Sequence, residues 1–245
     1  MELNSLRKAS VSRKVRRSFG LCWTHSAVVV TLHLLILNDF LLGGLLVKYP
    51  ELFVLRHGQT EWNVAGKFQG QKNSPLTAKG KMQAQLQYEL LSGIETLPKK
   101  AFVSPQYRTV HTAQIALGPQ IEQKLDDRLK EINFGTWEGK TKPEVKSLAG
   151  DDYESGLWHF ASPQGETFDD ISARVQSFLD ELTGPAIIVT HGITSIILRG
   201  IYMGLSQLDL LQLPRKQGCI YHLADGVEQL IAKSEKDQRT LSYVS

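Results

Sequence analysis

The stretch LFVLRHGQTEWN, residues 52–63, decides the fold. Glu51–Leu55 is a short, mainly apolar run of the kind that forms strands buried on both faces of a parallel sheet. Arg56, His57 and Gly58 follow it at once. In an open α/β sheet the ligand crevice lies beyond the carboxyl ends of the strands. This stretch therefore predicts a buried strand that carries an arginine and a histidine to a binding site.

Two further apolar runs, Ala101–Ser104 and Pro185–Thr190, have the same character, and each leads into a polar turn. Between the runs, apolar residues recur at spacings of three and four, which predicts amphipathic helices. We expect helices at Thr77–Leu91 (with Thr77 as N-cap), Tyr107–Leu117, Thr167–Leu182 and Ile193–Met203, and a closing hairpin of Cys219–Leu223 and Val227–Ile231. Alternating strands and helices predict an α/β fold: a three-layer sandwich with a mostly parallel central sheet and helices on both faces.

Polar residues follow all three predicted strands, so a parallel sheet would bring them to one edge. Ser104-Pro105-Gln106-Tyr107-Arg108 follows the second strand, and His191-Gly192 follows the third. Together with the first strand, they supply two histidines and two arginines. The stretch 126–139 adds Glu131, with the aromatic residues Phe134 and Trp137 close enough in sequence to shield it from water.

This set of side chains indicates an anion site. Two histidines and a glutamate can hold zinc with one open position, but a divalent cation beside two permanently charged guanidinium groups is electrostatically unfavourable. The planar donors of arginine instead match phosphate oxygens. A neutral imidazole beside a bound phosphate is a competent nucleophile, and a protonated carboxyl group can act as the general acid. The residues therefore predict phosphoryl transfer to a histidine, with no metal.

Four motifs in this order resemble the histidine phosphatase superfamily, which contains the cofactor-dependent phosphoglycerate mutases and many phosphatases. The resemblance covers roughly residues 50–225, which is most of the chain after its first 47 residues. The motifs are LRHGQTEWN at 55–63, Ser104-Pro105 with Arg108 and Thr112-Ala113, Glu131 with Phe134-Gly135 and Trp137-Glu138-Gly139, and Thr190-His191-Gly192.

The resemblance implies a role for each catalytic candidate. His57 would form the phosphohistidine, while Arg56, Arg108 and His191 hold the phosphate. Glu131 would protonate the leaving group and then activate water. No metal or organic cofactor is implied.

Three further residues are candidates for substrate binding. Asn63 and Gln69 match positions that line the phosphate pocket in relatives, and the amide of Gly192 would add a donor. The side chains of Asn63 and Gln69 could instead only stabilise a loop. Four aromatic residues could either pack in the core or line the substrate pocket: Trp62, Phe68, Trp158 and Phe160.

The segment after Glu131 favours hydrolysis over mutase chemistry. A mutase retains a bisphosphorylated intermediate, which calls for additional cations, and mutases of the family typically carry a longer, arginine-bearing insertion here. This chain has no arginine between Arg128 and Arg174. We therefore expect a metal-independent phosphomonoesterase acting on a small phosphorylated metabolite. A mutase and a non-catalytic phospho-ligand binding protein remain as alternatives. The turn-rich segment 135–165 is the expected lid.

The composition and charge of the chain limit the kinds of partner that we expect it to bind. With 42% hydrophobic and 22% charged residues, the chain has the make-up of a globular protein. Residues 1–46 carry six Lys and Arg against Glu2 and Asp39, so the rest has 22 basic and 23 acidic residues, a formal charge of −1. Such a balance gives no electrostatic basis for nucleic-acid binding. Cys22 and Cys219 form no CxxC pair, which argues against a disulfide framework or a thiolate zinc site.

The first 47 residues lie outside the resemblance. We expect an N-terminal extension at 1–47 and a catalytic domain at 48–245. Ala27–Val47 is apolar and about as long as the roughly 20 residues that cross a bilayer. It is interrupted by Asp39, however, and no small-residue cleavage site follows. The alternatives are a wrongly chosen start, a membrane anchor and an export signal. Of these we favour the first, and with it a cytoplasmic enzyme. Neither the substrate nor the oligomeric state follows from the sequence.

Overall fold

The computed structural model describes residues 49–150 and 157–233, which lie in the second of two compact units, Val47–Ser245. A six-stranded sheet runs through them in the order β3-β2-β4-β1-β5-β6. The first four are parallel, and β5 and β6 form an antiparallel hairpin beside β1. The strands are β1 (Leu52–Arg56), β2 (Lys100–Val103), β3 (Glu122–Leu125), β4 (Ala186–Thr190), β5 (Ile220–Ala224) and β6 (Val227–Ile231).

Strand β1 is central, and its pairing creates the site edge. It lies parallel to β4 with Arg56 opposite Thr190, and antiparallel to β5 with Leu52 opposite Leu223. The pairing continues one residue further, since the amide of His57 donates to the carbonyl of Thr190 at 3.0 Å. The residues that follow β1 and β4 therefore lie side by side, as the parallel sheet predicts.

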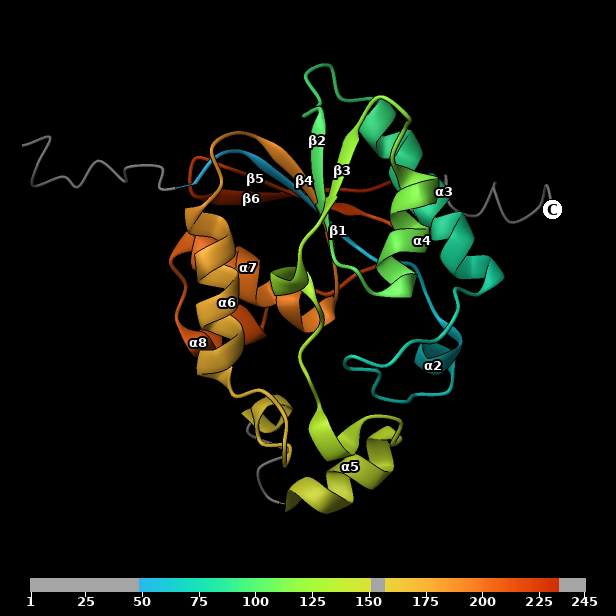
Figure 1. The fold of residues 1–245 in the computed structure, drawn as a ribbon, viewed down its shortest axis with the longest axis vertical. Helices are drawn as coiled ribbons and strands as arrows, with labels where there is room; N and C mark the ends of the chain where they lie inside the picture. Colours follow the sequence, from blue (N-terminus) through green and yellow to red (C-terminus); the bar gives the residue numbers. More distant parts are fainter. Residues whose placement is uncertain (1–48, 151–156, 234–245) are drawn as a thin grey trace, which may run out of the picture. The chain divides into compact units, whose positions relative to one another are not determined.

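Helices cover both faces of the sheet, which confirms the expected three-layer α/β sandwich (Figure 1). The sheet can bury both faces because side chains alternate along each strand. In β1, Leu52 and Val54 join the core beneath one helical layer, whereas Phe53 and Leu55 join the core beneath the other. The first layer is α6 (Phe168–Asp180), α7 (Gly192–Met203) and α8 (Gln207–Leu211), and the second is α3 (Ala78–Ser92) and α4 (Tyr107–Ala116).

The helix ends follow the capping residues in the sequence. Thr77 caps α3 as predicted, because its hydroxyl accepts a hydrogen bond from the amide of Gly80 at 3.0 Å. Thr167 begins α6 with a reciprocal capping box to Asp170. Gly204 ends α7 in the left-handed conformation that favours glycine, at φ 67°.

The strand β3 and the helix α5 (Lys142–Ala149) were not predicted, nor were the shorter helices α2 (Glu61–Val64) and α8. The strand β3 lies at the edge of the sheet, and all its side chains are exposed. The helix α5 lies within the expected lid segment, where Pro143 occupies the first turn. Residues 151–156 of that segment lie outside the described residues. The short elements around α5 are α2 and the 3-10 turns η1 (Asp127–Leu129), η2 (Gly135–Trp137) and η4 (Leu157–Phe160).

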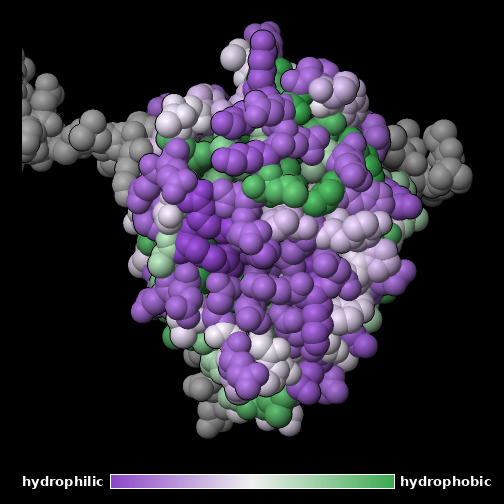
Figure 2. Space-filling model, in the orientation of Figure 1, coloured by the Kyte–Doolittle hydropathy of each residue, from purple (hydrophilic) through white to green (hydrophobic). Residues whose placement is uncertain are grey.

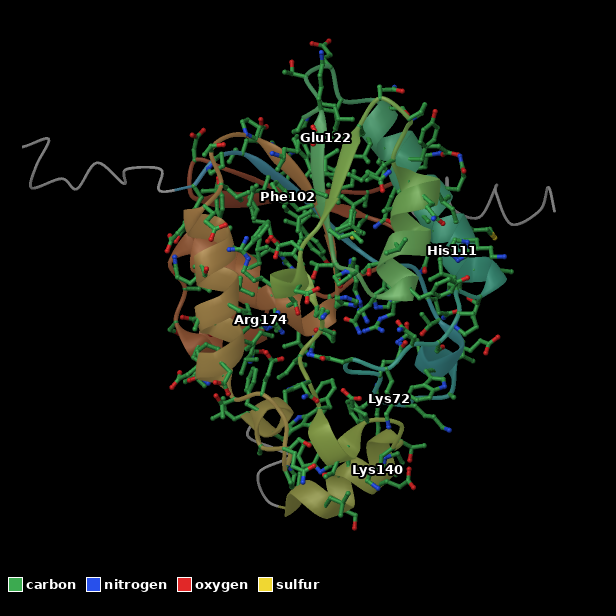
Figure 3. The ribbon with its side chains drawn as sticks, viewed as in Figure 1. Lys72, Phe102, His111, Glu122, Lys140 and Arg174 are labelled. Carbon is green, nitrogen blue, oxygen red and sulfur yellow. The ribbon has the colours of Figure 1, made fainter. Side chains whose placement is uncertain are left out.

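The helix α5 lies beyond the carboxyl edge of the parallel strands. Figure 3 shows Lys72 and Lys140 toward this end of the described unit, and Glu122, at the start of β3, at the opposite end. The face in view is mainly hydrophilic, with small hydrophobic areas (Figure 2). The exposed apolar side chains of the described unit include Leu125 on β3 and Leu148 on α5.

The expected apolar segment Ala27–Val47 lies outside the described residues. Within 49–150 and 157–233, none of the helices combines the length and the apolar character needed to cross a bilayer.

Candidate active site

The imidazole of His57 lies buried at the end of β1, with only 2% of its surface exposed. Its Nδ1 is 2.7 Å from the carbonyl oxygen of Gly58. A carbonyl can only accept, so Nδ1 carries the proton and Nε2 keeps its lone pair. Burial lowers the pKa of His57 well below the ordinary 6.5, and the charges of Arg108 and Arg56 act in the same direction. At neutral pH the ring is therefore neutral and nucleophilic at Nε2.

Arg56 has one side of its guanidinium fixed and the other free. Nη1 donates to the main-chain carbonyl of Arg215. The buried Nε has no hydrogen-bond partner among the described residues. Burial lowers the pKa of Arg56, but a guanidinium stays charged in proteins. The edge formed by Nε and Nη2 is thus a ready fork for two oxygens of an anion.

Arg108, in the first turn of α4, is held on all three nitrogens. Nη1 donates to the carbonyl of Lys72 at 2.7 Å, Nη2 to that of Gly70 at 2.8 Å, and Nε to Nδ1 of His191 at 3.1 Å. Burial lowers the pKa of Arg108 to about 10, against the opposing charge of Glu131. The group is therefore cationic at neutral pH and fixed in direction.

His191 follows β4 and supports Arg108 from behind. Because Nδ1 accepts from Arg108, the proton sits on Nε2, which donates to the hydroxyl of Ser104 at 2.7 Å. Burial, and next the charge of Arg108, lowers the pKa of His191 well below 6.5. The rings of His57 and His191 are 5.3 Å apart. Both ring nitrogens of His191 are thus committed to protein partners.

Glu131 is held by the start of α7. Oε2 accepts from the amide of Ile193 at 3.2 Å, and Oε1 accepts from the amide and the hydroxyl of Thr194, each at 3.1 Å. The aromatic residues Phe134 and Trp137 are buried, and Phe134 shares the pocket wall with Glu131. The amide donors on both oxygens therefore fix the position of the carboxyl group at the pocket wall.

The three predicted substrate-binding residues line the same pocket, at different positions. Asn63 uses Oδ1 to cap α2, accepting from the amide of Thr60 at 3.1 Å, which leaves Nδ2 as a donor. Gln69 donates to the hydroxyl of Thr60 at 2.6 Å, and its buried Oε1 has no partner among the described residues. A Cβ at Gly192 would lie 3.3 Å from Cζ of Arg56, so a glycine lets the guanidinium approach the helix start.

A pocket of about 710 Å³ unites these groups. His57, Arg56, Arg108, Glu131 and the three substrate-binding candidates line it, while His191 lies behind Arg108. Within 49–150 and 157–233, no cluster of three or more His, Cys, Asp or Glu residues is placed to hold a metal ion.

A family model for the histidine phosphatase superfamily, branch 1, matches residues 52–232, which span the sheet and every residue of this site. The chain belongs to this superfamily. Its relatives include both phosphatases and phosphoglycerate mutases.

Three similar proteins illustrate the range of activities in the superfamily. An acid phosphatase of Mycobacterium tuberculosis is 29% identical over 191 residues, covering 75% of this chain and 92% of that protein. A 2,3-bisphosphoglycerate-dependent phosphoglycerate mutase of Bifidobacterium longum is 37% identical over 122 residues, covering 47% of this chain and 49% of the mutase. The crystal structure of the α-ribazole phosphatase of Shigella flexneri matches with a TM-score of 0.64 at 27% identity, covering 75% of this chain and 96% of that one.

This member of the histidine phosphatase superfamily has pocket residues that sequence reasoning missed. They come from α8 and the loop after it, from η4 and from the paired segments 66–68 and 140–142: Lys67, Lys142, His159, Leu208, Leu211, Gln212, Arg215 and Gln217. Of these, Gln217 donates from Nε2 to the carbonyl of His57 at 2.9 Å. None belongs to a recognisable motif, so only the folded chain reveals them. Of the four ambiguous aromatics, Phe68 and Trp158 line the pocket.

Proposed function

We propose that this protein is a phosphatase that hydrolyses phosphate monoesters of small metabolites through a phosphohistidine at Nε2 of His57. The observation that carries the proposal is the protonation pattern of His57, whose Nδ1–H is tied to the carbonyl of Gly58 at 2.7 Å. The free Nε2 opens on a pocket that also contains Arg56 and Arg108. A neutral nucleophile beside two cations suits attack on a phosphate dianion.

In the first step, Arg56 and Arg108 hold the phosphate oxygens, with the amide of Gly192 as a further donor. Nε2 of His57 attacks phosphorus as the bond to the ester oxygen breaks. The proton on Nδ1 stays with the imidazole, and the carbonyl of Gly58 stabilises the positive charge that develops there. Glu131 donates its proton to the leaving oxygen, so the alcohol departs neutral.

In the second step, water attacks the phosphohistidine. Glu131, now a carboxylate, takes a proton from the water, and the bond between phosphorus and Nε2 breaks. Inorganic phosphate and the neutral imidazole are regenerated. His191 contributes by holding Arg108 in place, since its ring nitrogens are bound to Arg108 and Ser104.

In this scheme, protein groups stabilise each charge that develops on the phosphate, the imidazole and the leaving group. We therefore propose that no metal is required. The absence of arginine between Arg128 and Arg174 supports hydrolysis over phosphate return, because a mutase must retain a second phosphate against water. Gln69 supports the phosphate site if its amide turns. The hydroxyl of Thr60 would then donate to Oε1, and Nε2 would face the phosphate.

The test is phosphate release from a panel of monoesters, including p-nitrophenyl phosphate and 3-phosphoglycerate, with a chelator present. We expect release to persist with chelator, to vanish in His57→Ala and to survive in His111→Ala, a matched change on α4 outside the pocket. A phosphoprotein that is stable in alkali and labile in acid should form with the wild type alone when the reaction is stopped with alkali. Faster interconversion of 3- and 2-phosphoglycerate than phosphate release would favour the mutase, and phosphate binding without turnover would favour the binding protein.

We also propose that residues 1–47 are dispensable for the chemistry and that the enzyme is cytoplasmic. The residues that line the pocket all lie between Arg56 and Gln217. A chain that begins at Lys48 should retain full kcat/KM. Recovery of the intact chain in carbonate-washed membranes would contradict the cytoplasmic location.

A further inference from the structure

The strap, residues 214–217 between α8 and β5, supports two catalytic residues. The carbonyl of Arg215 accepts from Nη1 of Arg56, and the side chain of Gln217 donates to the carbonyl of His57 at 2.9 Å. Because Nη1 of Arg56 is held in this way, the other edge of the guanidinium, formed by Nε and Nη2, is left for the phosphate. The direction of the carbonyl of Arg215 therefore sets the direction of the phosphate fork.

A single peptide unit links Arg56 to Tyr221 in β5. The carbonyl of Arg215 and the amide of Lys216 belong to the same trans peptide, in which the two groups point in opposite directions. The amide of Lys216 donates to the hydroxyl of Tyr221 at 2.6 Å. Because a peptide unit is planar and rigid, a fixed amide also fixes the carbonyl that Arg56 binds. Rotation of this plane would turn the carbonyl away from Nη1 of Arg56.

Tyr221 is held at its ring as well as at its hydroxyl. The side chain is fully buried, and the guanidinium of Arg199 in α7 lies over the ring, with Cζ 3.6 Å from the ring centroid. Burial raises the pKa of Tyr221 to about 12, so its hydroxyl is neutral at physiological pH. Tyr221 thus offers the amide of Lys216 a hydroxyl acceptor at a fixed position.

Arg199 connects this ring to the start of the strap. Its Nη1 donates to the carbonyl of Pro214 at 2.7 Å, while Nε and Nη2 donate to the two carboxylate oxygens of Glu228 in β6 at 2.5 and 2.7 Å. The side chain of Arg199 is fully buried, and neither Arg199 nor Tyr221 lines the pocket. A buried guanidinium with all three nitrogens bound is rigid, so Arg199 fixes both the strap and the ring of Tyr221.

We propose that Tyr221, supported by Arg199, is a positioning residue for Arg56 and acts through the peptide between Arg215 and Lys216. It sets the affinity of the site for phosphate without touching the substrate. This inference rests on the proposed function, in which Arg56 holds the phosphate, and adds to it two residues that lie outside the pocket.

The experiment measures the Kd of orthovanadate, a phosphate analogue that adopts the geometry of phosphoryl transfer, by titration calorimetry. The change Tyr221→Phe keeps the ring and removes only the hydroxyl. We expect the Kd to rise about 3- to 10-fold, which corresponds to the loss of one neutral hydrogen bond. The matched control is Tyr202→Phe in α7, because the buried hydroxyl of Tyr202 has no hydrogen-bond partner among the described residues. The Kd of the control should equal that of the wild type.

A double-mutant cycle with Arg56→Met separates positioning from a general loss of structure. Without the guanidinium the peptide has nothing to orient, so Tyr221→Phe should then change the Kd by less than about 1.5-fold. A second route to the same test combines Arg199→Met with Glu228→Gln, which removes the support and leaves no unpaired buried charge. This pair should also raise the Kd about 3- to 10-fold, and only while Arg56 is present.

Three results would overturn the inference while the phosphatase stands. The first is an unchanged Kd in Tyr221→Phe, and the second is an equal rise in Kd with and without Arg56. The third is a lower urea midpoint with no change in Kd, which would assign Tyr221 to stability alone. If the cycle shows coupling and yet no ester releases phosphate, the positioning role is supported and the proposed function fails.

Discussion

Exchange of each phosphate-site arginine for lysine separates a structural role from a catalytic one. In Arg108→Lys, an ammonium replaces a guanidinium that binds the carbonyls of Lys72 and Gly70 and Nδ1 of His191 at 2.7, 2.8 and 3.1 Å. A lysine can retain one of these contacts, and Gly70 keeps a second donor in Gln106. A buried acceptor left without its donor costs about 1–3 kcal/mol. We therefore expect a loss of about 2–4 kcal/mol in the free energy of unfolding.

The same exchange at Arg56 should be much milder for stability. Among the described residues, the guanidinium of Arg56 makes one hydrogen bond, to the carbonyl of Arg215, and a lysine can replace it. We expect a loss of about 1 kcal/mol or less. Both variants should still lose at least about 100-fold in kcat/KM, because an ammonium cannot offer the two parallel donors of a guanidinium.

Urea unfolding followed by tryptophan fluorescence gives the stability difference, and phosphate release from p-nitrophenyl phosphate gives the activity. The reasoning is refuted if Arg56→Lys destabilises the fold as much as Arg108→Lys does. It is refuted equally if either variant retains wild-type kcat/KM.

Three further outcomes follow from the site. Because burial and the neighbouring arginines lower the pKa of His57, kcat/KM should stay level as pH falls past 6.5, and an acid limb centred at 6.5 or above would contradict this. Below pH 6.5 the unfolded chain binds a proton that folded His57 excludes, so stability should fall with falling pH, and less steeply in His57→Ala. Glu131→Gln should slow phosphate release from alkyl phosphates by about 100- to 10,000-fold. Release from p-nitrophenyl phosphate should slow far less, since p-nitrophenolate needs little protonation to leave, and equal losses of rate on both esters would exclude the acid role. Gly192→Ala places a Cβ 3.3 Å from Cζ of Arg56 and should lower kcat/KM about 10-fold. The free energy of unfolding should stay within about 1 kcal/mol of the wild type, and unchanged activity would show that the guanidinium can move without penalty.

The buried helices and strands were predictable because burial requires apolar residues at a regular spacing, and that spacing is visible in the sequence. The apolar runs of β1, β2 and β4 and the periodic helices α3, α4, α6 and α7 all lie within a few residues of the expected ranges. The strand β3 was missed because its residues Glu122–Leu125 are exposed at the sheet edge, where no apolar pattern is required. The helix α5 was missed because only Val145 among its residues is buried.

The site was predictable only where a residue follows a strand. Arg56, His57 and His191 come directly after β1 and β4, so topology alone brings them together. Arg215 and Gln217 reach the pocket from a loop whose sequence has no recognisable pattern. The loop is held partly by the amide of Lys216, which donates to the hydroxyl of Tyr221 in β5. The glycine after His57 has a packing role that the sequence does not reveal. A Cβ at Gly58 would lie 2.1 Å from the carbonyl oxygen of Gly80, so the glycine permits packing against α3.

The place of β1 in the sheet determines when the site can be assembled during synthesis. β1 is the first strand of the described chain to leave the ribosome, yet its neighbours are β4 and β5, which are the fourth and fifth to emerge. Until Ala186–Thr190 and Ile220–Ala224 are made, the amide of His57 has no Thr190 to bind and Arg56 has no Arg215. Closing such distant contacts is slow, because a long loop must be ordered first. The nucleophile is therefore translated early and placed late, and a nascent chain that ends before β4 exposes an unpaired apolar strand that a chaperone could bind.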